Sequence, residues 1–167
     1  MKQLTDEQFD KVVCDYSQML FKVAYSYTKS ITDSEDIVQE VFMKLYRARK
    51  VFENDEHIKN WLIRVTINQS INENKRKQKE LLIGDEYINN LPDTSDADEK
   101  NEEIYDCVCS LKDSYKTIII LYFYDNYCIK EIANILKISE SNVTTRLNRA
   151  KRKLKEIIVE RRANNGR

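Results

Sequence analysis

The last quarter of the chain places hydroxyl, amide and guanidinium side chains on a predicted helix. Val143, Leu147, Ala150 and Leu154 recur at helical spacing and form its apolar side. Exposed side chains near the start of such a helix can hydrogen-bond to base edges in a major groove. The candidates for base contacts are Ser141, Asn142, Thr144, Thr145 and Arg146. The candidates for phosphate contacts follow them and are Arg149, Lys151, Arg152 and Lys153.

A second polar stripe lies near the middle of the chain. Its residues recur about every four positions, which places them on one side of a predicted helix. They are Arg64, Asn68, Asn72 and Arg76, and Lys75 beside the last of them is a further candidate. Cations and amides in one stripe suit contacts with phosphates and unstacked bases, and Trp61 offers an aromatic ring nearby. Trp61 also falls on the apolar side of the helix, which favours packing in the core.

The charge of the chain is distributed unevenly although its net value is zero. Residues 129–167 contain 11 Lys and Arg against four Glu, and residues 59–79 contain six against one. Residues 84–106 contain nine Asp and Glu against one Lys. A single charged run is typical of a solvated helix face. Here, however, each of the two basic runs contains one of the two polar stripes. This coincidence favours nucleic acid as the partner.

Composition and periodicity predict an all-helical chain. Hydrophobic residues make up 41% of it, with one Pro and two Gly. Thr5 and Gln8 form a capping box that predicts the start of a first helix, and Thr32 with Glu35 predicts the start of a second. A third helix is expected from Ile58 into the basic residues near position 76.

The second half of the chain predicts a linker and a helix-turn-helix. Residues 80–103 lose helical periodicity, contain the only Pro and are strongly acidic, which is typical of a flexible linker. Beyond them, Asp113 is a candidate cap for one helix and Ser139 for the last. A short helix at 129–136 and a turn at 137–139 precede that last helix. We therefore expect two small helical domains, with a helix-turn-helix in the second.

Catalytic and metal-binding interpretations find little support. His57 is the only histidine, and the chain lacks a Gly-rich phosphate loop. Cys107 and Cys109 are too close in sequence for a usual zinc knuckle. The acidic residues cluster in the predicted linker and not as an opposed acid and base pair. We expect no cofactor, no metal and no enzymatic activity of the chain by itself.

The sequence favours a cytoplasmic protein. Its longest apolar run, at 118–124, is far shorter than the roughly 20 residues that cross a bilayer, and the N-terminus lacks a signal-peptide core. The four cysteines are then expected to be reduced thiols.

Three segments in a fixed order resemble a known family. They are Asp33 to Phe42, Ile58 to Arg76 with its Trp61 and Asn68, and Glu131 to Lys151. Together they look like regions two and four of the sigma-70 family of bacterial RNA polymerase sigma factors, in its extracytoplasmic-function (ECF) group. The resemblance covers nearly the whole chain apart from the linker and the last few residues. It implies residues 1–79 as a region-two-like domain, 80–103 as the linker, 104–160 as a region-four-like domain and 161–167 as a basic tail.

The resemblance implies partners and residue roles. The helix that contains Asp36, Gln39 and Glu40 is expected to dock on the clamp helices of the largest polymerase subunit. The loop at 52–57 and the following helix are expected to bind the minus-10 promoter element and hold it open, with a base flipped from the stack. The last helix is expected to read the minus-35 element. Such factors are commonly held inactive by an anti-sigma protein, which we also expect here.

Several positions depart from the family pattern. Asn72 stands where the family usually has Asp, and Leu111 is followed by Lys112 instead of Pro. Asn126 replaces the usual Gly, and Cys128 replaces the usual Ser or Thr cap of the helix-turn-helix. Asn tolerates left-handed backbone geometry, whereas Cys is a poorer cap than Ser. These departures bear on promoter sequence preference more than on the fold.

Two alternatives remain open at the level of sequence. One is a two-domain helix-turn-helix regulator that acts without polymerase docking, and the other is a helical interaction protein whose basic faces are only solvated. The helix with Asp36, Gln39 and Glu40 favours a sigma factor over a plain regulator, because a regulator has no need for a second acidic and polar docking face.

Overall fold

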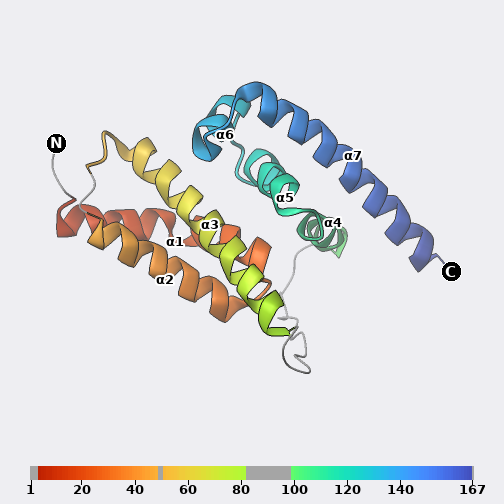
Figure 1. The fold of residues 1–167 in the computed structure, drawn as a ribbon, viewed down its shortest axis with the longest axis horizontal. Helices are drawn as coiled ribbons and strands as arrows, with labels where there is room; N and C mark the ends of the chain where they lie inside the picture. The colour runs from red at the N-terminus through yellow and green to blue at the C-terminus, as the bar shows by residue number, and fades with distance from the viewer. Residues whose placement is uncertain (1–3, 49–50, 82–98, 167) are drawn as a thin grey trace. The chain divides into compact units, whose positions relative to one another are not determined.

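The computed structural model describes residues 4–48, 51–81 and 99–166 (Figure 1). It divides into two compact units, residues 1–92 and 93–167. All regular elements among the described residues are helices, and none is a strand. The predicted all-helical fold class is therefore confirmed.

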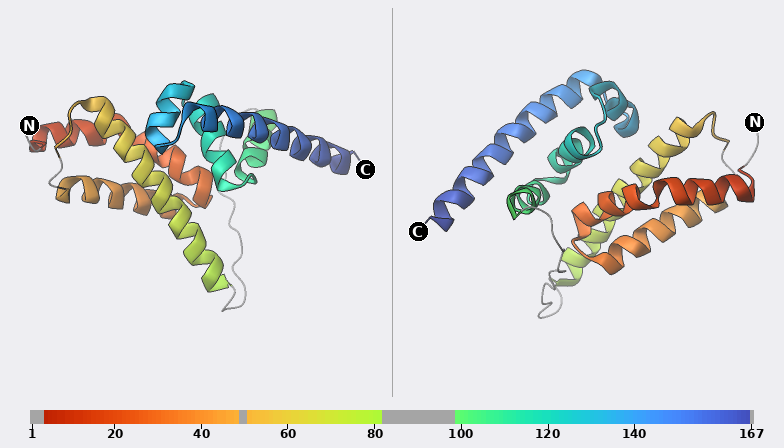
Figure 2. Two further views of the ribbon diagram at one scale, coloured as in Figure 1. Left: turned by 45° about the horizontal axis from the view of Figure 1, so that its top comes forward. Right: turned by 180° about the vertical axis from the view of Figure 1, so that it is seen from behind.

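The first unit is a bundle of three helices. They are α1 (Asp6–Thr28), α2 (Ile31–Arg47) and α3 (Asp55–Leu81). Helices α1 and α2 run antiparallel, and α3 lies across the pair, as Figure 2 shows. The centre of the bundle contains the fully buried side chains of Leu20, Leu45 and Leu62, so each helix contributes one apolar side to a common core.

The start of α1 follows its prediction, and that of α2 does not. The Thr5 hydroxyl accepts a hydrogen bond from the Gln8 amide, and the Gln8 side chain accepts one from the Thr5 amide, which confirms the capping box. The second helix is capped by Ser30 and not by Thr32. Lys29 ends α1 in left-handed geometry, so Ser30 already offers its oxygen to the amide of Asp33.

The second unit packs four shorter elements together with one long helix. In chain order they are α4 (Glu99–Cys109), α5 (Asp113–Ile119), η1 (Ile120–Tyr124), α6 (Ile129–Leu136) and α7 (Glu140–Asn165). Helices α4, α5 and α6 all contact α7. Ser139 caps α7 as predicted, since its hydroxyl accepts a hydrogen bond from the Asn142 amide at 3.2 Å.

Two features of this unit differ from expectation. Asp113 is the first residue inside α5, and the capping position belongs to Lys112, whose side chain makes no capping bond. The helix then widens into the π-helical turn η1, where the Asp125 amide bonds to the Ile120 carbonyl five residues earlier. Asn126 takes left-handed geometry, with φ of 56°, as its residue type allows.

The predicted linker is only partly described. Helix α3 continues to Leu81 and α4 begins at Glu99, so helix occupies both ends of the segment predicted as linker at 80–103. The remainder of that prediction, 82–98, lies outside the described residues. In the described part of the chain, no helix has the length and apolar character that crossing a membrane requires.

Candidate nucleic-acid interface

A tight turn sets the angle between α6 and α7. Lys137 ends α6 in left-handed geometry, with φ of 55°, and the Ile138 amide bonds back to the Ala133 carbonyl at 3.1 Å. Val143 is fully buried, and Leu147 and Ala150 continue the same buried stripe of α7. The apolar stripe therefore fixes which side of α7 faces solvent.

The side of α7 away from this stripe contains the predicted base-contacting residues. Ser141, Asn142, Thr144 and Thr145 are exposed, and Arg146 is half-buried. Each helical residue advances by about 100° around the axis. Ser141, Thr145 and Arg152 are therefore directly opposite the buried stripe, while Thr144 and Arg146 are on its two flanks. The structure brings all five predicted residues to the first two turns of one helix.

Some of the predicted phosphate contacts already have intramolecular partners. Lys153 forms an ion pair with Glu156 at 2.7 Å, and its hydrogen bond to Glu156 raises the pKa of Lys153. The Lys151 ammonium lies 5.4 Å from the ring centres of both Tyr122 and Phe123. No hydrogen bond or ion pair holds the exposed side chains of Arg149 and Arg152 within the described part of the chain. These two arginines are the freest cations of the predicted set.

The predicted minus-10 stripe lies along α3. Asn68, Asn72 and Lys75 are exposed, and Arg64 is half-buried. Trp61, at the N-terminal end of the stripe, is only 8% exposed, and its ring and that of Phe52 pack edge to face with centres 5.8 Å apart. Trp61 thus packs in the core and supports the loop before α3.

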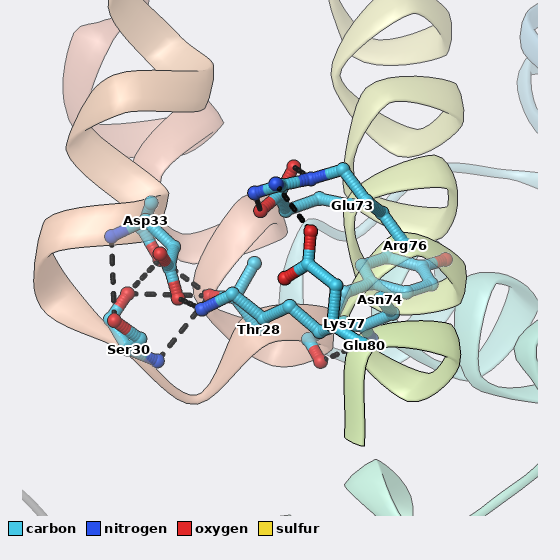
Figure 3. Close-up of polar contacts among 10 residues, drawn as sticks. Thr28, Ser30, Asp33, Glu73, Asn74, Arg76, Lys77 and Glu80 are labelled. Atoms are coloured by element: carbon cyan, nitrogen blue, oxygen red, sulfur yellow. Dashed lines mark hydrogen bonds and ion pairs between the residues drawn. The ribbon is translucent and has the colours of Figure 1, made fainter. Parts of the chain in front are cut away.

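Arg76 is the member of the stripe with the most contacts. It bonds to both oxygens of Glu73 and to Glu80, all on the exposed side of α3 (Figure 3). The hydrogen bonds and charge of Glu73, followed by the charge of Glu80, raise the pKa of Arg76. A phosphate that binds this guanidinium must compete with two carboxylates.

The predicted polymerase-contacting residues form an exposed polar face on α2. Asp36, Gln39 and Glu40 are all exposed. Glu40 pairs with Lys44 at 3.1 Å and accepts a hydrogen bond from Gln69 of α3 at 2.7 Å. Gln69 in turn accepts one from Lys44 at 2.6 Å, so a closed set of three side chains joins the two helices.

A second set of polar contacts was not predicted from sequence. It joins α3 to the corner between α1 and α2, and Figure 3 shows it in close-up. The Asn74 amide donates to the carbonyl oxygen of Tyr27 at 2.6 Å, and Lys77 forms an ion pair with Asp33. We call these two contacts the α3 clasp.

The described residues contain neither a disulfide nor a cluster of potential metal ligands. All four cysteines are free thiols, and no group of three or more His, Cys, Asp or Glu side chains is placed to hold a metal within the described residues.

The fold and these faces define a class of protein. The chain consists of a three-helix unit with a polar and basic stripe and a second unit with a helix-turn-helix, which is the architecture of a two-domain DNA-binding protein.

Comparison with known proteins narrows this class. Residues 12–80 match the family model for sigma-70 region 2, and residues 101–154 match the model for sigma-70 region 4. The RNA polymerase sigma factor SigV of Bacillus subtilis is 32% identical over 149 residues, which cover 89% of this chain and 90% of SigV. The ECF RNA polymerase sigma factor SigM of the same organism is 28% identical, over 89% of this chain and 93% of SigM.

Solved structures share the fold. The sigma factor RpoE of Bartonella quintana, in complex with the anti-sigma factor NepR, superimposes with a TM-score of 0.73 over 91% of this chain and 97% of that one, at 19% identity. CnrH, in complex with the cytosolic domain of CnrY, superimposes with a TM-score of 0.70 over 93% and 90%, at 21% identity.

The chain belongs to the sigma-70 family, in its ECF group. It is a sigma factor, which directs RNA polymerase core to promoter DNA at the start of transcription and is not an enzyme by itself. The alternative of a regulator that acts without polymerase is not favoured, because the match includes region 2 as well as the helix-turn-helix.

Proposed function

We propose that three separate faces of this sigma factor bind its three targets, which are two promoter elements and polymerase core. The outward face of α7 reads the minus-35 element, the outward stripe of α3 binds the opened minus-10 element, and the exposed face of α2 docks on polymerase core. The observation that supports this division best is that the predicted residues of each face are side by side on one helix and, with the exceptions of Trp61, Arg64 and Arg146, exposed.

Within α7, we assign base reading to the start of the helix and phosphate binding to its middle. Ser141 and Thr145 point away from the buried stripe, and Arg149 continues their line by one turn. Thr144 uses its hydroxyl hydrogen to bond the Glu140 carbonyl at 2.9 Å, which leaves its oxygen as an acceptor. An acceptor and a methyl group at this position suit the amino groups and thymine methyls of a major groove.

Within α3, we assign contact with unstacked bases to Asn68 and Asn72 and contact with phosphates to Arg64, Lys75 and Arg76. An amide offers both donors and an acceptor, so it can match the Watson–Crick edge of a flipped base. An aromatic group at the N-terminal end of the stripe consists of Phe52, His57 and Trp61. The centre of the Phe52 ring lies 5.5 Å from that of His57 and 5.8 Å from that of Trp61. The buried Trp61 acts there by supporting Phe52.

Photo-crosslinking tests this assignment. A photoreactive amino acid replaces Asn72 in one variant and Thr145 in another, and each is bound with core polymerase to a promoter that core transcribes only with this chain. Crosslinks from position 72 should fall in the minus-10 element and those from position 145 in the minus-35 element. Crosslinks from both positions to the same element would overturn the assignment.

We further propose that residues 1–79 and 104–160 form two separately folded domains joined by 80–103. The basic tail, 161–167, would extend beyond the second domain as a continuation of α7, which ends at Asn165. Binding of one domain to DNA would raise the effective concentration of the other, so two elements at a fixed spacing are read together. The protein would act in the cytoplasm, where promoter DNA and polymerase are found.

Regulation by an anti-sigma protein is proposed as well. It is supported by the structural likeness to RpoE and CnrH, each of which was solved with a partner bound. Purification of the tagged chain from cells grown with and without envelope stress tests it. A partner other than core polymerase should be recovered in at least one condition, and recovery of core alone in every condition would contradict this proposal.

A further inference from the structure

The C-terminal turns of α3 extend beyond the core that holds the rest of the helix. Up to Glu80, the last position of α3 whose burial the structure describes, Ile67 is the last buried apolar residue and Ser70 the last buried residue of any kind, and Ile71 is half-buried. This extension contains Asn72, Lys75 and Arg76 of the proposed minus-10 stripe. From Asn72 to Glu80, no buried apolar side chain fixes the orientation of the segment that would contact the opened DNA strand.

The α3 clasp supplies that fixation through polar bonds. Asn74 and Lys77 are one turn apart and continue the buried side of α3, in line with Ile67 and Ser70. The bonded partner of Asn74 is 47 positions earlier in the chain, and that of Lys77 is 44 positions earlier. Both bonds therefore join separate helices and add a tertiary restraint to the extension.

The partners of the clasp are at the two helix ends that meet in one corner. The Tyr27 carbonyl belongs to the last turn of α1. Asp33 is in the first turn of α2 and is half-buried. Burial raises the pKa of Asp33, but its hydrogen bonds with Lys77 and Ser30 outweigh this, and the pKa is lowered overall.

Hydrogen bonds among its own residues also hold the corner between α1 and α2. The Thr28 and Ser34 hydroxyls are 2.8 Å apart, and the Ser34 hydroxyl also bonds the Ser30 carbonyl at 2.6 Å. Ser34 is fully buried. The clasp thus attaches the α3 extension to a corner that is itself held by several hydrogen bonds (Figure 3).

The clasp and the DNA-facing residues occupy opposite sides of α3. Positions 74 and 77 differ from positions 72 and 75 by two residues, which is about 200° around the helix. DNA could therefore bind Asn72 and Lys75 without displacing either clasp bond.

We propose that Asn74 and Lys77 are positioning residues for promoter opening, which orient the Asn72, Lys75 and Arg76 side of α3 without touching DNA. This inference rests on the proposed function of α3. It predicts that loss of the clasp impairs the opened minus-10 complex, while polymerase docking and minus-35 reading stay intact.

The test uses the full chain with core polymerase. The double variant Asn74→Ala with Lys77→Ala is compared with the matched control Gln18→Ala with Lys22→Ala, which removes an exposed amide and an exposed amine one turn apart on α1. Promoter opening is followed by the fluorescence of 2-aminopurine in the minus-10 element. Opening should fall about tenfold in the clasp variant and stay within about twofold in the control. The single variant Lys77→Arg keeps Asn74 and the positive charge that pairs with Asp33. It should therefore retain most of the opening seen with the unchanged chain.

Three further readouts separate positioning from a general loss of stability. Affinity for core and binding of minus-35 duplex should be unchanged in the clasp variant. Backbone order parameters from nitrogen relaxation should fall at residues 75–80 and remain high, at about 0.85, near Leu62. A parallel loss of core binding, or normal opening, would overturn the inference. Asn68→Ala and Asn72→Ala test the assignment of α3 separately. Impaired opening in these two with normal opening in the clasp variant rejects the clasp alone. Normal opening in all three variants rejects both the clasp and the assignment of α3.

Discussion

Gln69 of α3 donates a hydrogen bond to a carboxylate oxygen of Glu40 on α2 at 2.7 Å. Lys44 bonds to both side chains, so the proposed polymerase-docking face and the proposed DNA-binding helix share one exposed polar network. Exposed ion pairs of this kind contribute only about 0 to 1 kcal/mol to stability. Glu40 is therefore available to a cationic partner at small cost.

The first prediction concerns this docking face. Asp36→Arg with Glu40→Arg should abolish association with core polymerase, because two attractive charges four residues apart become repulsive while both side chains stay exposed. Gln69→Ala should change core affinity by less than about fivefold, since the polar contacts of this exposed network contribute at most about 1 kcal/mol. Pull-down of core measures binding, and circular dichroism confirms unchanged helicity. Retention of normal amounts of core by the double variant would contradict docking through α2.

The second prediction separates base reading from phosphate binding on α7. Thr144→Ala and Thr145→Ala should relax the choice of minus-35 sequence, because they remove groups that would face base edges. Binding to a panel of minus-35 duplexes with single base changes measures this choice. An unchanged order of preference across the panel would count against the assignment.

The third prediction compares two cations of the same helix. Arg152→Ala should weaken binding to all minus-35 duplexes alike and reduce the slope of log affinity against log salt by about one. Lys151→Ala should reduce that slope by less, because Lys151 is drawn toward Tyr122 and Phe123, 5.4 Å from each ring centre. Fluorescence anisotropy between roughly 50 and 200 mM salt gives both slopes. Equal slopes for the two variants would disprove the distinction.

The fourth prediction concerns the carboxylates beside Arg76. Glu73→Gln with Glu80→Gln should raise the affinity for a single-stranded minus-10 oligonucleotide severalfold, because Arg76 loses its competing partners and the phosphate meets less negative charge. Glu35→Gln, an exposed carboxylate on α2, is the matched control. Titration of the oligonucleotide against the holoenzyme measures the effect. The same affinity in variant and control would show that Arg76 does not contact the strand.

The fifth prediction follows from the lowered pKa of Asp33. A carboxyl whose folded pKa lies below its unfolded value, about 3.9, stabilises the fold above that value and loses this contribution as the pH falls through the folded pKa. Asp33→Asn should therefore lower the melting temperature of the chain at pH 7 and have a smaller effect near pH 3. Thermal unfolding at both values measures the difference. An equal effect at the two pH values would mean that the Lys77 ion pair does not contribute.

Much of the fold could be predicted because periodicity and capping are local properties. The apolar stripe of Val143, Leu147 and Ala150 specified the orientation of α7, and Ser139 marked its start. The cap of α2 was misplaced because Thr32 and Glu35 also fit the capping pattern, while the choice of Ser30 depends on where Lys29 ends α1. The π-helical turn at 120–124 depends on packing within the second unit, which local sequence patterns do not reveal.

The candidate site was predictable to a similar extent. Helical spacing placed the stripe residues on α3 as predicted. The same spacing could also have predicted the contacts of Arg76, because Glu73 and Glu80 stand three and four residues away from it. The bonds of Asn74 to Tyr27 and of Lys77 to Asp33 join helices far apart in the chain, so only the packed structure reveals them. The aromatic partners of Lys151 were hidden for the same reason.

The most direct test of the central claim is a selection of promoter DNA by the complete holoenzyme. Core polymerase with this chain is mixed with random duplexes, and the DNA kept in heparin-resistant open complexes is sequenced. The account predicts two short conserved blocks at a fixed spacing, with variants of Thr144 and Thr145 altering only the upstream block and variants of Asn68 and Asn72 only the downstream one. A single conserved block, or both sets of variants altering the same block, would contradict it.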